Sequence, residues 1–224
     1  MLAREAAVCS LVPHPHLMSV LADHSAESLP YLVMPLCEGV TLARLVAGNS
    51  AMAVSTACWI ARQTAEALAA LHDGGWLHGD IKPASILLSP HGHATLLSLG
   101  LARRLGTAEC QPTDWLPTSP AYAAPEAFAT RGTLSAASDI YSLGAVLFEL
   151  LAARPLFHAD SFVELAHAPR RLAPPSIRQH NASVPSDLAH LLKQMLAKEP
   201  LRRPPASEVV RWLAEIEIAE LAAL

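Results

Sequence analysis

The chain has 224 residues, of which 52% are hydrophobic, so it can bury one sizeable core, and its length favours a single domain. The formal net charge is −4, with 16 basic and 20 acidic residues, so nothing indicates nucleic acid or an anionic membrane surface as a partner. The longest apolar run, from Leu143 to Ala153, is interrupted by Glu149 and falls well short of the roughly 20 residues that a membrane span needs.

No signal peptide is visible, because Arg4 and Glu5 come at once and no apolar segment follows them. The four cysteines are scattered without metal-like spacing, so we expect reduced thiols in a cytoplasmic protein: Cys9, Cys37, Cys58 and Cys110. Two His-x-His pairs, His14/His16 and His91/His93, are too short a pattern to predict a metal site.

The first 37 residues have the composition of a helix followed by a hairpin. Residues 2–12 favour a helix, which Pro13 ends. Two short apolar runs follow across a polar turn, Met18–Ala22 and Tyr31–Met34, and they predict two strands. Taken alone, this stretch would suit any helix plus hairpin.

Two helices are predicted next. Thr41 to Ala47 is short, and Thr41 is a plausible N-cap. Ala53 to His72 is long and alanine-rich, with one apolar stripe that belongs to the core, and Gly74-Gly75 ends it.

The stretch from Trp76 to Leu88 places an acid, a base and a hydroxyl in a short loop between two apolar pieces that predict strands. Pro83 stiffens this loop, so that Asp80 and Lys82 can point into the same small volume. An acid that orients a hydroxyl beside an ammonium that neutralises phosphate charge suits phosphoryl transfer.

A second hairpin is predicted from Ile86–Leu88 and Ala94–Leu97, with His91-Gly92 at its turn. The chain up to Glu126 is then polar and proline-rich, with little regular structure expected.

The second half is mostly helical by its pattern. Ser138 opens an almost uniformly apolar helix to Leu151, which must be buried, and Asp139 within it needs hydrogen-bond partners. Residues 155–185 indicate loops around a small helix. Ser186 is expected to cap a helix through Leu196, and a last amphipathic helix follows.

Four of these segments, in this order, resemble the signatures of Ser/Thr protein kinases, and the composition indicates a bacterial type. The loop His78-Gly79-Asp80-Ile81-Lys82-Pro83 is similar to the catalytic loop His-Arg-Asp-Leu-Lys-Pro. Ser98-Leu99-Gly100 is similar to Asp-Phe-Gly, and Thr118 to Glu126 to Gly-Thr-Pro-x-Tyr-x-Ala-Pro-Glu. Lys198 to Pro204 is similar to Asp-Pro-x-x-Arg-Pro.

The resemblance covers essentially the whole chain and implies one kinase-like domain over residues 1–224, an α+β fold that is mostly α. Residues 1–37 would form an incomplete small lobe, with helix C and two strands to the hinge, and residues 38–224 a complete helical large lobe. Kinases begin with a Gly-rich loop and a strand lysine. Here no lysine precedes Lys82 and no glycine precedes Gly39. Either these elements lie upstream of Met1, or the protein works without half of its small lobe.

The resemblance also implies roles for individual residues. Asp80, Lys82 and Ser119 would be the catalytic residues on the substrate side, with the Ser119 hydroxyl bridging the other two. Met34 would be the gatekeeper, and Pro35 and Cys37 would offer hinge backbone groups to adenine.

Six further residues would be structural. Glu5 would pair with the strand lysine, Asp139 would accept backbone N–H groups of the loop that contains His78, and Gly100 would form a turn. The polar stretch that ends at Glu126 would be the activation segment. Glu126 and Arg203 would form an ion pair that holds this segment to the large lobe.

The sequence departs from the kinase signatures at the positions that bind magnesium. Magnesium prefers oxygen ligands, above all carboxylates, yet Ser85 and Ser98 occupy the two positions that hold it in kinases. Glu109 and Asp114 follow in the polar segment and are poor substitutes. We therefore expect no metal site and weak or absent binding of ATP and magnesium.

The leading hypothesis is a pseudokinase that acts by docking protein partners. A weak Ser/Thr protein kinase with unconventional metal use is the main alternative. A small-molecule phosphotransferase also carries His-Gly-Asp, but Ala124-Pro125-Glu126 and Asp139–Gly144 argue against it.

Overall fold

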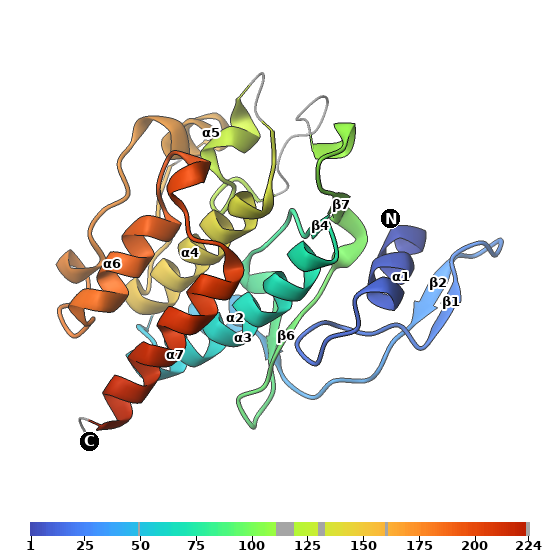
Figure 1. Ribbon diagram of the computed structural model, residues 1–224, viewed down its shortest axis with the longest axis horizontal. Coiled ribbons are helices and arrows are strands. Elements are labelled where there is room, and N and C mark those ends of the chain that lie inside the picture. The colour runs from blue at the N-terminus through green and yellow to red at the C-terminus, as the bar shows by residue number, and fades with distance from the viewer. Residues whose placement is uncertain (49, 111–118, 130–132, 160, 223–224) are drawn as a thin grey trace.

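A buried helix, α4 (Ala136–Ala152), runs through the helical part of the computed structural model (Figure 1). Every residue from Ser138 to Leu151 is buried, as expected for a helix that is apolar all round. The structure describes the chain except for residues 49, 111–118, 130–132, 160 and 223–224. Helices α3 and α6 pack directly against α4, so the core of the larger part is built around it.

Helices dominate the described chain. In order they are α1 (Leu2–Leu11), α2 (Leu42–Val46), α3 (Val54–Asp73), α4 (Ala136–Ala152), α5 (Phe162–Arg171), α6 (Ser186–Met195) and α7 (Ala206–Ala222). The longest of them, α3, packs along both α4 and α7. Its apolar stripe enters the core, as the sequence predicts.

The strands are short and form three small antiparallel sheets. They are β1 (Ala22–His24), β2 (Tyr31–Val33), β3 (Val40–Thr41), β4 (Trp76–Leu77), β5 (Ile86–Leu88), β6 (Ala94–Leu96) and β7 (Arg103–Arg104). Strand β1 pairs with β2, β4 with β7, and the third sheet has the order β3-β5-β6. The β1–β2 and β5–β6 hairpins are therefore present, as predicted before and after the loop of residues 78–83, which we call the central loop.

The first part of the chain forms a smaller unit beside the helical part. In Figure 1, α1 and the β1–β2 hairpin lie on the side opposite α6 and α7. The units are joined by the packing of α1 against the turn Leu99–Leu101 and by hydrogen bonds at β6, among them the one from the Met18 N–H to the Leu96 carbonyl at 2.9 Å. The arrangement agrees with the expected mostly helical kinase-like fold.

Some predicted boundaries are wrong. Residues Met18–Ala22 do not form a strand, because Met18 bonds to Leu96 instead, and β1 begins only at Ala22. Thr41 does stand at the N-cap of α2, but its side chain makes no capping hydrogen bond. Ser186 is the first helical residue of α6, since Pro185 occupies the N-cap with an extended backbone.

Among the described residues, no helix combines the length and apolar character that crossing a membrane requires.

We expect Ala153→Gly to stabilise the fold. Ala153 ends α4 in the left-handed conformation, with φ 55° and ψ 27°. This conformation costs an L-residue about 1–2 kcal/mol, and glycine adopts it freely but loses more entropy on folding, so the net gain should be about 0.5–1 kcal/mol. Urea denaturation measures it. Ala152→Gly, inside the helix, is the matched control and should lose about 0.5–1 kcal/mol. Equal losses for both variants would contradict the prediction.

Candidate functional site

Asp139 on α4 holds the central loop in place. Its carboxylate accepts the backbone N–H of His78 at 2.8 Å and of Gly79 at 2.9 Å, while only 1% of the residue is exposed. The prediction that this acid accepts loop N–H groups is therefore confirmed. A third partner, the Nε2 of His72 at 2.9 Å, was not foreseen, although His72 lies in the last turn of a helix predicted to reach it.

His78 connects the loop to Leu97, the residue directly after β6. The ring is fully buried; Nε2 donates to the Leu97 carbonyl at 2.9 Å, and Nδ1 accepts the Asp80 N–H at 3.2 Å. Burial lowers the pKa of His78, so its imidazole stays neutral in this role. The ring thereby positions the backbone of Asp80.

Asp80 and Lys82 point at each other, as the loop sequence predicts. The Lys82 Nζ lies 2.5 Å from the Asp80 Oδ2, with 25% and 8% of the two side chains exposed. Ser119 lines the same small cavity as Asp80. Its bridging of Asp80 and Lys82 stays a prediction, and Thr118, which opens that motif, lies outside the described residues.

Ser85 uses its hydroxyl to close the loop on itself. The residue is fully buried; its Oγ accepts the Lys82 N–H at 3.0 Å and donates to the Lys82 carbonyl at 2.9 Å. The loop is therefore stable without a ligand at this position, and the hydroxyl is already committed to backbone groups.

Ser98 is exposed and has a left-handed backbone, with φ 68° and ψ 53°. Such a conformation is strained for a serine, whereas aspartate and asparagine tolerate it better. The backbone therefore suits an acid at position 98 better than the serine that stands there.

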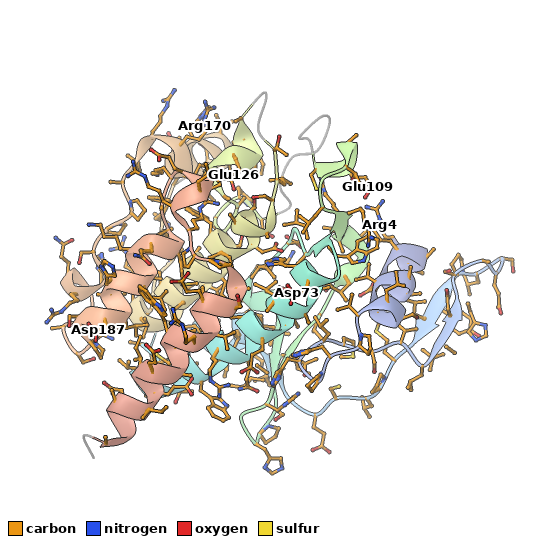
Figure 2. All side chains as sticks on the ribbon, viewed as in Figure 1. Arg4, Asp73, Glu109, Glu126, Arg170 and Asp187 are labelled. Atoms are coloured by element: carbon orange, nitrogen blue, oxygen red, sulfur yellow. The ribbon has the colours of Figure 1, made fainter. Side chains whose placement is uncertain are left out.

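The residues at these two positions do not fit magnesium. Both side chains are neutral hydroxyls, and no group of three or more His, Cys, Asp or Glu within the described ranges could hold a metal ion. Glu109 is paired with Arg4 at 3.1 Å, as the facing side chains in Figure 2 show. Asp114, the other acid considered, lies outside the described residues.

Glu5 on α1 has a partner that the sequence did not predict. Its Oε1 accepts the backbone N–H of Leu99 at 3.1 Å. Leu99 itself is fully buried, and Gly100 lies next to the Glu5 carboxylate in the turn Leu99–Leu101. The acid predicted to pair with a strand lysine thus ties α1 to the start of the segment after β6.

The predicted hinge residues lie between β2 and β3, in the link between the two units. Met34 and Pro35 are half-buried, and Cys37 is exposed with a free thiol. Their contact with adenine stays a prediction.

The two His-x-His pairs meet in the structure. The rings of His16 and His93 stack with centroids 4.5 Å apart. Nδ1 of His16 lies 2.8 Å from the Ala94 carbonyl, and Nε2 of His93 lies 3.0 Å from the Pro15 carbonyl. These histidines hold the loop after α1 against the β5–β6 hairpin.

Glu126 and Arg203 form the predicted ion pair, which is bidentate, with Arg203 donating to the two carboxylate oxygens at 2.7 and 2.8 Å. None of the Arg203 side chain and 9% of that of Glu126 is exposed. The guanidinium also donates to three backbone carbonyls, those of Ala137, Ala197 and Lys198. Arg203 therefore joins the end of the activation segment, α4 and the chain before α7.

A second buried acid was missed as part of the site. Glu149 on α4 accepts a hydrogen bond from the Tyr122 hydroxyl at 2.7 Å. Burial raises the pKa of the Tyr122 hydroxyl and that of the Glu149 carboxyl. The available signal was that Glu149, like Asp139, is an acid in a mostly apolar helix, and such a group needs a partner. This bond fixes the Tyr122 loop beside the cavity near Asp80.

Comparisons with known proteins agree with this geometry. The model of the protein kinase domain matches residues 1–212. The chain is 33% identical over 205 residues to the serine/threonine-protein kinase PrkC of Bacillus subtilis, covering 92% of this chain and 32% of that protein. It is 35% identical over 208 residues to the serine/threonine-protein kinase PknB of Mycobacterium leprae, covering 89% and 33%. The chain thus spans about a third of the length of these relatives.

Replacing Arg203 by alanine should destabilise the protein strongly. The change leaves the nearly buried Glu126 carboxylate without its counter-ion, with only the Ser138 hydroxyl still donating to it among the bonds described, and frees three carbonyls, so the loss should be about 3–5 kcal/mol in urea denaturation. Arg203→Lys keeps the positive charge but loses the two-pronged geometry of the guanidinium. Its loss of stability should therefore lie between zero and the loss for Arg203→Ala.

The matched control is the neighbouring pair. Arg202 and Glu199 lie 2.7 Å apart but are 72% and 65% exposed. Arg202→Ala should therefore cost less than about 1 kcal/mol. Similar losses of stability for Arg202→Ala and Arg203→Ala would show that the buried pair contributes no more to stability than the exposed one.

Proposed function

The chain belongs to the protein kinase domain family, and from that premise we propose that it is a pseudokinase, a kinase-fold module that acts by binding protein partners. The observation that carries the proposal is the pair of serines at the metal positions. Ser85 bonds to the backbone of its own loop, and Ser98 is a neutral side chain on a backbone that suits an acid.

The electrostatics support this proposal. In phosphoryl transfer, bound metal ions neutralise most of the charge that develops on the phosphates. Lys82 supplies a cation beside Asp80, and it is engaged with that acid at 2.5 Å. Asp80 could still orient a hydroxyl, but the chain offers no carboxylate at positions 85 or 98. We therefore propose that ATP and magnesium bind weakly or not at all.

The alternative is an active Ser/Thr protein kinase that transfers the ATP γ-phosphate to protein serine or threonine with unconventional metal use. The intact arrangement of Asp80, Lys82 and Asp139 favours it, and so do the serine/threonine-protein kinases among its relatives. A cytoplasmic location is proposed for either function, since the four cysteines are free thiols.

We predict that the purified 224-residue chain transfers no phosphate from radiolabelled ATP, to itself or to generic Ser/Thr peptides, in the presence of magnesium. The physical reason is that neither serine can hold a metal on the phosphates. The control is Asp80→Asn, which removes the acid that orients the hydroxyl. Transfer by the parent chain that disappears in this variant would establish the active kinase instead.

Restoring the metal-side residues should separate binding from activity. Ser85→Asn combined with Ser98→Asp should make ATP bind at least about tenfold tighter with magnesium than with EDTA, which corresponds to about 1.4 kcal/mol. Activity should stay poor, because the chain has no lysine before Lys82. The matched control, Ser85→Asn with Ser98→Asn, suits the left-handed backbone but adds no charge, and it should show no magnesium effect. Equal magnesium sensitivity in the two double variants would contradict the argument from charge.

A further inference from the structure

A groove of about 340 Å³ lies between α6 and α7, on the side of the molecule far from α1 (Figure 1). Its floor is apolar and comes from one face of α7: half-buried Trp212, nearly buried Ile216 and exposed Ala219. None of the residues of the central loop lines it. The groove is therefore separate from the candidate site.

An aromatic wall stands at one side of this groove. The His190 ring on α6 is stacked with Trp212, at a centroid distance of 6.0 Å and an angle of 19° between the planes. The amide nitrogen of Gln194 lies 3.1 Å from His190 Nε2. The wall thus offers a flat aromatic surface.

The rim carries three carboxylates, Asp187 from α6 and Glu215 and Glu220 from α7. Figure 2 shows Asp187 at the outer side of α6. None of the three forms an ion pair within the described part of the chain, and no lysine or arginine lines the groove. Their neighbours on α7 are paired: Glu217 with Arg62 at 3.0 Å, and Glu208 with Arg211 at 3.7 Å. Negative charge without an internal partner is therefore concentrated at the groove.

We propose that this groove binds a segment of a partner protein that presents an arginine flanked by apolar side chains. A guanidinium can stack on an aromatic face and at the same time donate to carboxylates, which a compact ammonium does less well. The flanking apolar side chains would cover Ile216 and Ala219. The groove's volume of about 340 Å³ is at the lower end of the range of ligand pockets, so it can take up one or two side chains of a segment rather than a broad protein surface.

The proposal does not depend on phosphoryl transfer, so the radiolabel assay and the binding assay fail or succeed separately. The probe is the peptide acetyl-Leu-Arg-Leu-Arg-Leu-amide, titrated calorimetrically into the 224-residue chain. Its control has citrulline in place of both arginines, which keeps the shape but removes the charge and replaces one NH2 donor group of each side chain by a carbonyl acceptor. We expect submillimolar binding of the arginine peptide and at least about tenfold weaker binding of the citrulline peptide, about 1.4 kcal/mol.

The matched variants test the rim. Asp187→Asn with Glu215→Gln should weaken binding of the arginine peptide about three- to tenfold, while Glu208→Gln, on the same helix but outside the groove, should leave it unchanged. Both variants replace exposed or half-buried surface acids by neutral isosteres, and thermal melting checks that each is folded.

Four results would overturn the proposal. They are no binding at millimolar peptide, equal binding of the citrulline peptide, an unchanged affinity in the double variant, and sedimentation showing a dimer that the double variant abolishes. The second would mean an apolar groove without cation recognition, and the last would mean that a second copy of the chain occupies it.

Discussion

The carboxylate of Asp139 is the interaction on which the candidate site depends. A charged group that is 1% exposed in an apolar helix would be very unfavourable without partners, and it has three: two loop N–H groups and the ring of His72. The same hydrogen bonds position His78 and Gly79, so the stability of α4 and the conformation of the central loop depend on each other. His78 in turn positions the backbone of Asp80 and is bonded to Leu97, the residue directly after β6.

The structure separates two sets of interactions that serve phosphoryl transfer together in kinases. The scaffold set, Asp139 with the loop and Glu126 with Arg203, is complete and consists of contacts within the chain. The metal set is represented by Ser85 and Ser98, which supply hydroxyls where a carboxylate and an amide are needed. Since the scaffold set involves no nucleotide, the fold does not require a bound ligand to hold its loop.

The sequence predicted most accurately where burial leaves few choices. A buried acid in an apolar helix needs hydrogen-bond donors, and the kinase resemblance implied loop N–H groups as donors to Asp139 and Arg203 as the partner of Glu126. The caps of α2 and α6 and the first strand were predicted less well, because they depend on contacts far away in the chain: the segment at Met18 is bound by Leu96 and does not form a strand. The bond from Tyr122 to Glu149 was likewise invisible, since neither residue stands in a pattern that specifies the distance between their segments.

Glu5 shows how the same acid can serve the fold without the lysine that the family resemblance implies for it. By accepting the Leu99 N–H it fixes α1 against the turn in which Leu99 is fully buried, so the smaller unit is joined to the larger one by a backbone contact. This contact lies directly beside Ser98, whose left-handed backbone is strained for a serine. The local geometry at position 98 is therefore imposed by its neighbours, the buried Leu99 and the carboxylate of Glu5, rather than by any ligand that Ser98 could hold. A conformation fixed in this way does not depend on a charge at position 98, so the fold and the chemistry of this site are separable.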